Sequence, residues 1–227
     1  MKRSEVWVDF ETGGVKHWIH SPLSIGAIAV INGKIVDEFY HNIRIEPLVV
    51  TPDALRTNKI DLTHPGISTK EEFKKLWMGF MNKNFYNYGK VRPNKENMPY
   101  FCGQNTVFDR PFLWELLETD FDYAYYHRID TMIFANILRS EGKLDDITDL
   151  KLETMSGYFH LPAPEMFHNS LCDIKQTYQV YQCLLRIMRG ESIDQIRKSV
   201  EAQPSLPFDA PNVVPPISKA AVGTKAD

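Results

Sequence analysis

The sequence predicts an α/β protein built on one mixed sheet, in which an antiparallel meander is followed by parallel strands and helices cover both faces. The first observation behind this class is an Asn-Gly pair at residues 32–33, a strong hairpin signal, between two strand-like runs. The second is the alternation of strand-like and helical periods from residue 68 onward, which is typical of strands connected by helices that pack on a sheet.

The N-terminal strands come first. Residues 6–11 alternate in the two-residue period of a half-buried strand. Apolar runs at residues 23–30 and 35–40 flank the Asn-Gly turn and predict the two arms of a hairpin, and residues 42–45 continue in strand-like fashion. The chain is therefore expected to open with an antiparallel meander.

An amphipathic helix is expected next. From Ser68 onward the apolar residues recur at helical spacing, and Ser68 and Glu71 are placed as a capping box at the helix start. Residues 82–98 lack a period and predict a long loop. Residues 99–103 then predict a short apolar strand.

The second half of the chain is predicted to be mostly helical. Asp109 precedes a helix with Pro111 in its first turn, so the ordinary role of Asp109 is a helix N-cap. A strand is expected near residues 123–129, and helices are expected at residues 131–139, 150–159, 173–190 and 193–202. Residues 203–227 are rich in proline and poor in apolar side chains, so we expect a folded domain over residues 1–202 and a disordered tail.

Length and composition limit the function. The 227 residues are 43% hydrophobic and 24% charged, which is typical of a globular domain. The formal net charge of −3 excludes binding to nucleic acid through bulk positive charge, so any such contact is local. The sequence has no apolar run near the roughly 18 residues of a membrane span, so we expect a soluble, cytoplasmic protein without membrane contact. Its three cysteines lack CxxC spacing and predict reduced thiols.

Two carboxylates lie on one face of the first strand. Asp9 and Glu11 are two residues apart, which places their side chains on the same side about 7 Å apart. Like charges on a half-buried strand repel each other and lose hydration, and a bound cation relieves both effects. The alternative is a solvated strand end that holds no ion. The pair alone leaves both interpretations open.

Three further residues extend the acidic pattern. Asp109 stands between a strand and a helix, and His168 and Asp173 lie five residues apart before the last long helix. Each has an ordinary role on its own, namely a helix N-cap, a loop histidine and a first-turn aspartate favoured by the helix dipole. Together the order reads Asp-x-Glu-Thr-Gly, then Gln-Asn-x-x-Phe-Asp, then His-x-x-x-x-Asp.

That order resembles the DEDDh family of 3′-to-5′ exonucleases on the ribonuclease H-like fold, which includes polymerase proofreading subunits, oligoribonuclease and ribonuclease T. The resemblance rests on residues 8–13, 103–109 and 168–173, with supporting matches at residues 129–131 and 150–152. All five functional positions of the family match this sequence, and the three motifs occur in the family's order and setting.

The resemblance implies hydrolysis of phosphodiester bonds at the 3′ end of nucleic acid with two Mg²⁺ or Mn²⁺ ions. Asp9, Glu11 and Asp173 would hold the ion that carries the nucleophilic water. Asp9 would also bridge to the second ion, which Asp109 would reach directly or through water. His168 is implied as the general base, since an imidazole titrates near neutral pH.

The resemblance also implies substrate contacts at Thr12, Gly13, Asn105 and Phe108. The alternatives are turn geometry for Gly13 and core packing for Phe108.

The loop after the first helix mixes basic and aromatic side chains, which suits binding of single-stranded nucleic acid. The alternative is a solvated loop whose aromatic residues pack against the core. These loop residues are Lys83, Phe85, Tyr86, Tyr88, Lys90, Arg92 and Lys95.

The tail carries a docking signal. Residues 203–208 resemble the short peptide with which bacterial replication proteins bind the sliding clamp, with Gln203, Leu206 and Phe208 as the binding residues. The alternative is a proline-rich tail without a partner.

The docking signal favours DNA as the substrate. The alternative functions are an exoribonuclease of the oligoribonuclease type and a non-catalytic polymerase or clamp adaptor. The resemblance also allows a homodimer.

Overall fold

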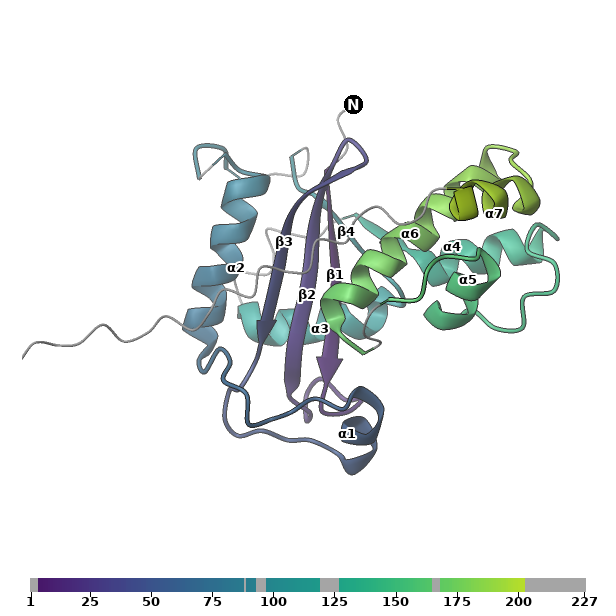
Figure 1. Ribbon diagram of the computed structural model, residues 1–227. Coiled ribbons are helices and arrows are strands. Elements are labelled where there is room, and N and C mark those ends of the chain that lie inside the picture. Colours follow the sequence, from purple (N-terminus) through teal and green to yellow (C-terminus); the bar gives the residue numbers. More distant parts are fainter. Residues whose placement is uncertain (1–3, 88, 93–96, 119–126, 165–167, 203–227) are drawn as a thin grey trace, which may run out of the picture.

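The computed structural model describes residues 4–87, 89–92, 97–118, 127–164 and 168–202 (Figure 1). Its strands are β1 (Ser4–Thr12), β2 (Pro22–Ile31), β3 (Lys34–Asn42), β4 (Tyr100–Gly103) and β5 (Arg128–Asp130). They form a sheet in the order β3-β2-β1-β4-β5. β2 is antiparallel to β1 and β3, whereas β4 is parallel to β1 and β5. The predicted mixed sheet with its N-terminal meander is therefore confirmed.

Helices cover both faces of this sheet. They are α1 (Pro52–Asn58), α2 (Lys70–Asn84), α3 (Thr106–Leu117), α4 (Thr131–Ser140), α5 (Leu152–Tyr158), α6 (Ser170–Met188) and α7 (Ile193–Ala202). α2 and α3 pack on one face, where Phe73 and Phe112 join the even-numbered side chains of β1 in one buried cluster. α6 packs on the other face, where Ile174 and Tyr178 share a buried cluster with Trp7.

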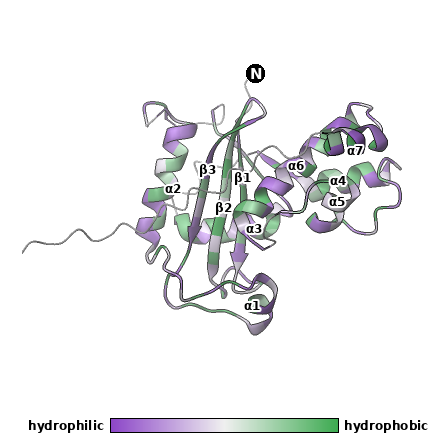
Figure 2. Cartoon of the chain, in the orientation of Figure 1, coloured by the Kyte–Doolittle hydropathy of each residue, from purple (hydrophilic) through white to green (hydrophobic). Residues whose placement is uncertain are grey.

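Hydrophobic side chains explain why β1 and β2 are central. Figure 2 shows hydrophobic residues concentrated along these two strands, whereas β3 at the sheet edge is largely hydrophilic. A second core lies beside the sheet, where α4, α5 and α7 pack around α6 through Ala135, Met155, Leu184 and Ile196 (Figure 1). Because α6 contributes to both cores, it connects the sheet to the helical part of the domain.

Two helix starts differ from the prediction. α2 begins one residue later than expected: its N-cap is Thr69 and not Ser68, and the Thr69 side chain accepts the N–H of Glu72. Glu72, and not Glu71, completes the cap, since its carboxylate accepts the N–H of Ser68. Periodicity does not predict α1, which has seven residues after a Thr51 N-cap and is too short for an apolar stripe.

α3 begins at Thr106, before Asp109 and not after it. The Asp130 carboxylate accepts the backbone N–H of Thr106 at 2.7 Å. The acceptor for the start of this helix is therefore Asp130 and not Asp109. Asp109 therefore lies inside the helix, and the N-cap role expected for it is wrong. Pro111 consequently falls in the helix interior and not in the first turn.

Two loop boundaries also differ from the prediction. α2 runs into the loop expected at residues 82–98, and the strand expected at residues 42–45 is reduced to an isolated bridge from Ile43. Phe85 and Tyr86 pack against the core, and Tyr86 keeps only 2% of its surface exposed. The alternative interpretation of the loop, with its aromatic residues held against the core, therefore applies at both positions. Outside the described residues lie Tyr88 and Lys95.

Two parts of the expected structure fall outside the described residues. The first is the start of the strand expected at residues 123–129, of which β5 contains the end. The second is residues 203–227, with the docking residues Gln203, Leu206 and Phe208. Disorder of the tail, clamp docking and the homodimer stay predictions. Among the helices of the described residues, none is long and apolar enough to cross a membrane.

Candidate metal centre

β1 presents two carboxylates on the face that α6 covers. The two-residue period places the even-numbered side chains of β1 in the core beneath α2 and α3, so Asp9 and Glu11 share the opposite face with Trp7. Asp9 lies opposite Gly26 of β2 in the antiparallel register. The side chains of Asp9 and Glu11 therefore lie near the point where α6 crosses β2.

The start of α6 lies directly against β2. A Cβ built on Gly26 would lie 2.3 Å from the backbone nitrogen of Leu171, so a residue larger than glycine does not fit here. The hydroxyl oxygens of Ser24 and Ser170 are 3.1 Å apart across the same contact. This close approach brings the first turn of α6, which carries Asp173, beside the two carboxylates of β1.

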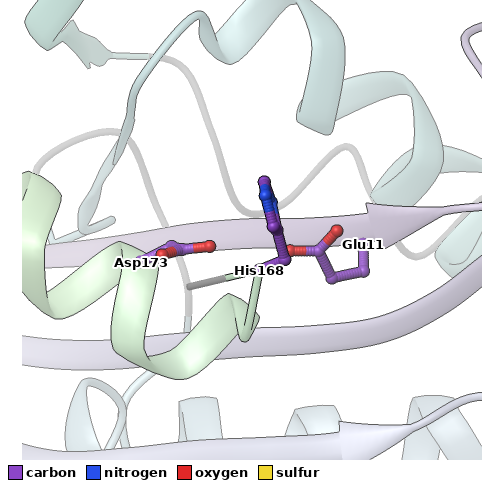
Figure 3. Close-up of side chains that lie close together, drawn as sticks. All are labelled: Glu11, His168 and Asp173. Carbon is purple, nitrogen blue, oxygen red and sulfur yellow. The ribbon is translucent and has the colours of Figure 1, made fainter. Parts of the chain in front are cut away.

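Glu11, His168 and Asp173 meet at one point. One potential ligand atom of each residue lies within 4.8 Å of those of the other two. In Figure 3 the carboxylates of Glu11 and Asp173 point toward each other from β1 and α6, with His168 between them. His168 is exposed and has a positive φ of 61°, and the next residue, Asn169, caps α6 by accepting two backbone N–H groups.

Asp109 approaches the same region from α3. β4 pairs with β1 as far as Trp7, and α3 follows β4 where this pairing ends. There the Asp109 Oδ1 accepts the backbone N–H of Phe10 at 3.0 Å. Asp109 is 3% exposed, and its charge is one cause of the raised pKa of Asp9. The five motif residues, from β1, α3 and the start of α6, are thus brought together.

Burial raises the pKa of all four carboxyl groups and is the largest cause in each. The charges of the other cluster carboxylates add to it at Asp9 and Glu11, and the charge of Asp130 adds to it at Asp109. The pKa of Glu11 rises to about 8, with the charges of Asp173 and Asp109 adding to burial. The pKa of Asp109 also rises to about 8, although its hydrogen bond from Phe10 opposes the change. The pKa of Asp173 rises to about 6, and the pKa of Asp9 is raised by burial and by the three other carboxylates.

This arrangement fits a divalent cation. Carboxylate oxygens are the ligands that hard cations such as Mg²⁺ prefer. Burial and the three neighbouring charges all raise the pKa of Asp9, so a positive charge at this position would relieve the repulsion. A ring nitrogen of His168 lies within 4.8 Å of ligand atoms of Glu11 and Asp173, at the exposed side of the cluster.

We expect Mg²⁺ to stabilise the protein more near pH 8 than near pH 5. The pKa values of Glu11 and Asp109 are raised from 4.5 and 3.8 to about 8, so ionising these groups destabilises the metal-free fold. This destabilisation grows as the pH rises from the ordinary pKa values of the two groups to about 8. Mg²⁺ binds the ionised carboxylates and should raise Tm by several degrees near pH 8. Thermal unfolding with Mg²⁺ or EDTA at both pH values measures this, and an equal effect at both contradicts the site.

Two predicted substrate residues end β1 and begin the next loop. Thr12 is buried, and its backbone carbonyl accepts a hydrogen bond from the Asn58 side chain at 3.1 Å. The Gly13 N–H donates to the carbonyl of Ser21, and the Gly13 carbonyl accepts the N–H of Thr51, both at 2.7 Å. These bonds hold the end of β1 against α1. Contact of either residue with a substrate stays a prediction.

The other two predicted substrate residues lie at the start of α3. Asn105 has a φ of 57° and immediately precedes the helix. Phe108 is half-buried, and its ring centroid is 5.4 Å from that of Phe112. Packing against the core, the ordinary role of Phe108, is present, and a contact with substrate through its exposed part stays a prediction.

Two further residues, one before α4 and one in the loop after β1, have no predicted functional role. Asp130 binds the first N–H groups of α3, and the sequence signal is an aspartate directly before a helix. Trp18 is 66% exposed in the loop after β1. Its ring centroid is 4.9 Å from that of His17, which lies 3.3 Å from the Glu115 carboxylate of α3. A single exposed tryptophan in a loop belongs to no periodic pattern, so the sequence alone does not single it out.

Comparison with solved structures identifies the fold. A product-bound exonuclease I aligns with a TM-score of 0.62 and 13% sequence identity, over 89% of this chain and 46% of that chain. The zinc-bound complex of Escherichia coli exonuclease I with single-stranded DNA aligns with a TM-score of 0.60 and 15% identity, over 86% and 42%. Exonuclease X in complex with 5′-overhanging duplex DNA aligns with a TM-score of 0.54 and 18% identity, over 86% and 98%. Neither a family model nor a curated protein matches the sequence.

The chain has the ribonuclease H-like fold of exonuclease I and exonuclease X, which are DEDD 3′-to-5′ exonucleases. This confirms the fold that the motif resemblance implies. The chain spans less than half the length of the exonuclease I structures that it matches and nearly the full length of exonuclease X. The class that fold and site define is thus a ribonuclease H-like domain with an acidic centre.

Proposed function

We propose that this protein is a metal-dependent 3′-to-5′ exonuclease that hydrolyses phosphodiester bonds at the 3′ end of DNA. The observation that carries the proposal is the convergence of four carboxylates and one histidine on a fold shared with exonucleases. Buried carboxylates that repel one another destabilise a protein, and a bound cation accounts for such a cluster. The ordinary roles of these residues do not account for their convergence.

Two Mg²⁺ or Mn²⁺ ions are the proposed cofactors. Asp9, Glu11 and Asp173 would hold one ion, and Asp9 and Asp109 would hold the second. When bound, such a pair activates a water and neutralises the charge that develops on the phosphate and the leaving oxygen. The chain keeps the carboxylates close together, because Gly26 lets α6 approach β2 and a β1 amide holds Asp109.

His168 is proposed as the general base. Its ring lies in the same cluster as Glu11 and Asp173, on the exposed side from which water can enter. A neutral imidazole can accept the proton of the attacking water. The aspartates are less suited to this step, because a carboxylate that holds a cation is a weak base.

We expect His168→Asn to lower kcat about 10²- to 10⁴-fold, because asparagine cannot accept the proton. Asparagine tolerates the positive φ of 61°, so Tm should change little. The matched control is His160→Asn, since His160 is also exposed and has a φ of 57°, at the end of α5. Initial rates on labelled DNA and thermal unfolding measure both effects, and equal rates for the two variants contradict the assignment.

Thr12, Gly13, Asn105 and Phe108 are the proposed substrate contacts. They lie at the end of β1 and the start of α3, next to Glu11 and Asp109 in the chain. A terminal nucleotide bound there would have its phosphate at the acidic cluster. The exposed ring of Trp18, in the loop that follows β1, offers a surface on which a further base can stack.

DNA is the proposed substrate because structures with this fold contain single-stranded DNA or 5′-overhanging duplex DNA. The test uses 5′-labelled single-stranded DNA and RNA of the same sequence, each with Mg²⁺, Mn²⁺ or EDTA. We expect metal-dependent shortening from the 3′ end that is faster for DNA. Faster shortening of RNA would favour an exoribonuclease instead. No metal-dependent shortening of either substrate would contradict the exonuclease and favour a non-catalytic adaptor.

A further inference from the structure

One buried carboxylate holds the starts of two helices. Asp130 ends β5, is 9% exposed and is the N-cap of α4, where its Oδ1 accepts the N–H groups of Met132 at 3.0 Å and Ile133 at 3.2 Å. The same Oδ1 accepts the N–H of Asn105 at 3.1 Å. Its Oδ2 accepts the N–H of Thr106 at 2.7 Å and the Thr106 hydroxyl at 3.0 Å. Asp130 therefore ties the start of α3 to the start of α4.

The contacts to α3 replace a cap that this helix lacks. Asn105 occupies the N-cap position with a φ of 57°, and its own side chain makes no capping hydrogen bond. The first N–H groups of a helix need an acceptor from outside the helix. Asp130, 24 positions after Thr106 in the sequence, supplies that acceptor, and the Phe108 N–H closes the turn on the Asn105 carbonyl at 2.8 Å.

The start of α3 determines where Asp109 points. Asp109 lies in the first turn of the helix, and each residue of an α-helix is rotated by about 100° from the one before it. A start displaced by one residue would therefore turn the Asp109 carboxylate away from the Phe10 N–H, which it now meets at 3.0 Å. Asp109 is 3% exposed inside a packed region, so this orientation depends on the helix and not on the side chain alone.

We propose that Asp130 is a positioning residue for Asp109, and through it for the metal that Asp109 would hold. The hydrogen bonds of Asp130 go to the starts of α3 and α4, and none goes to the Phe10 amide or to the cluster of Glu11, His168 and Asp173. Its charge also acts on Asp109. The proposal rests on the exonuclease function above. It predicts that loss of the Asp130 carboxylate changes metal binding at Asp109 and not only the stability of the fold.

The test is Asp130→Asn. This substitution replaces one of the two acceptor oxygens with an NH2 group, which cannot accept a hydrogen bond from the helix N–H groups that it faces. We expect kcat on single-stranded DNA to fall about 10- to 100-fold, with KM within about twofold of wild type and a higher Mg²⁺ concentration at half-maximal rate. Thr106→Val removes one of the contacts to Asp130 and serves if Asp130→Asn does not fold. We expect the same changes at a few-fold scale for this milder variant.

The matched control is Asp149→Asn, which removes the same charge before the start of α5 but leaves an amide oxygen that can accept the Lys151 N–H. A merely structural role predicts that Asp130→Asn lowers Tm while kcat per folded molecule and the Mg²⁺ dependence stay at wild-type values, which would overturn the proposal. Titration calorimetry with Mn²⁺ adds a readout that does not need activity. Asp109→Asn should weaken binding of one ion, and Asp130→Asn should weaken the same ion.

The calorimetry also separates the two hypotheses. An inactive wild-type protein whose Mn²⁺ binding is weakened by Asp130→Asn would overturn the exonuclease function and support the positioning role. An active wild-type protein with unchanged Mn²⁺ binding and kcat in Asp130→Asn would support the function and overturn the positioning role.

Discussion

Asp9→Asn is expected to abolish exonuclease activity and, at the same time, to stabilise the metal-free protein. Asp9 is the carboxyl group whose pKa is raised by burial and by all three of its acidic neighbours, Asp109, Glu11 and Asp173. The neutral amide has nearly the same shape but removes this repulsion, so the free energy of unfolding near pH 8 should rise by on the order of 1–2 kcal/mol. The same change removes a ligand from both proposed ions, and kcat should fall by about 10³-fold or more.

Opposite changes in activity and stability distinguish a functional charge from a structural one. The measurements are initial rates with Mg²⁺ and urea unfolding with EDTA for wild type and variant. Asp145→Asn is the matched control, because Asp145 is exposed beyond α4 and should leave both values unchanged. A variant that retains wild-type activity contradicts the metal centre, and one that loses stability in EDTA contradicts the electrostatic account of Asp9.

Gly26→Ala is expected to be the most destabilising single substitution that adds one methyl group to the sheet. The new Cβ would lie 2.3 Å from the backbone nitrogen of Leu171 and 2.4 Å from the carbonyl oxygen of Ser170. Backbone atoms cannot rotate away as a side chain does, so α6 must move off β2, at a cost of about 3 kcal/mol. Because α6 carries Asp173, the variant should also lose the rise in Tm that Mg²⁺ produces.

The matched control for this substitution is Gly79→Ala. Gly79 is exposed in α2, and a Cβ built there meets nothing within 4 Å, so the same change should stabilise the protein by about 0.5–1 kcal/mol through helix propensity. Urea unfolding of both variants gives the two free energies. Equal effects of the two substitutions would show that the close approach of α6 to β2 is not what limits residue size at position 26.

Much of the fold could be predicted because the signals are local. The alternation of residues 6–11 indicates both the strand and the face shared by Asp9 and Glu11, and the Asn-Gly turn indicates the hairpin of β2 and β3. The long helices α2 and α6 follow from helical spacing, and α7 lies at the expected residues. The motif order predicts the residues of the candidate metal centre before any distance between them is known.

The elements that differ from prediction have long-range causes. α3 starts early because Asp130, on a later strand, accepts the N–H groups at its start. Tyr86 lies just after the end of α2, where the local sequence predicts a loop, but it is buried in the core cluster between α2, α3 and the sheet. α1 is short and lies where its Asn58 side chain binds the Thr12 carbonyl, 46 residues away in the sequence.

Local spacing was thus sufficient for most strands and for the long helices, because period depends on neighbours in the chain. The choice of the acidic residues rested on the order of the motifs and on the family resemblance. The geometry of the centre depends on pairs far apart in the sequence: Asp109 binds Phe10 across 99 positions, and Ser170 meets Ser24 across 146. Such contacts form when the sheet and helices pack. The raised pKa values of the carboxyl groups arise there as well, because both the burial and the repulsion exist only in the folded chain.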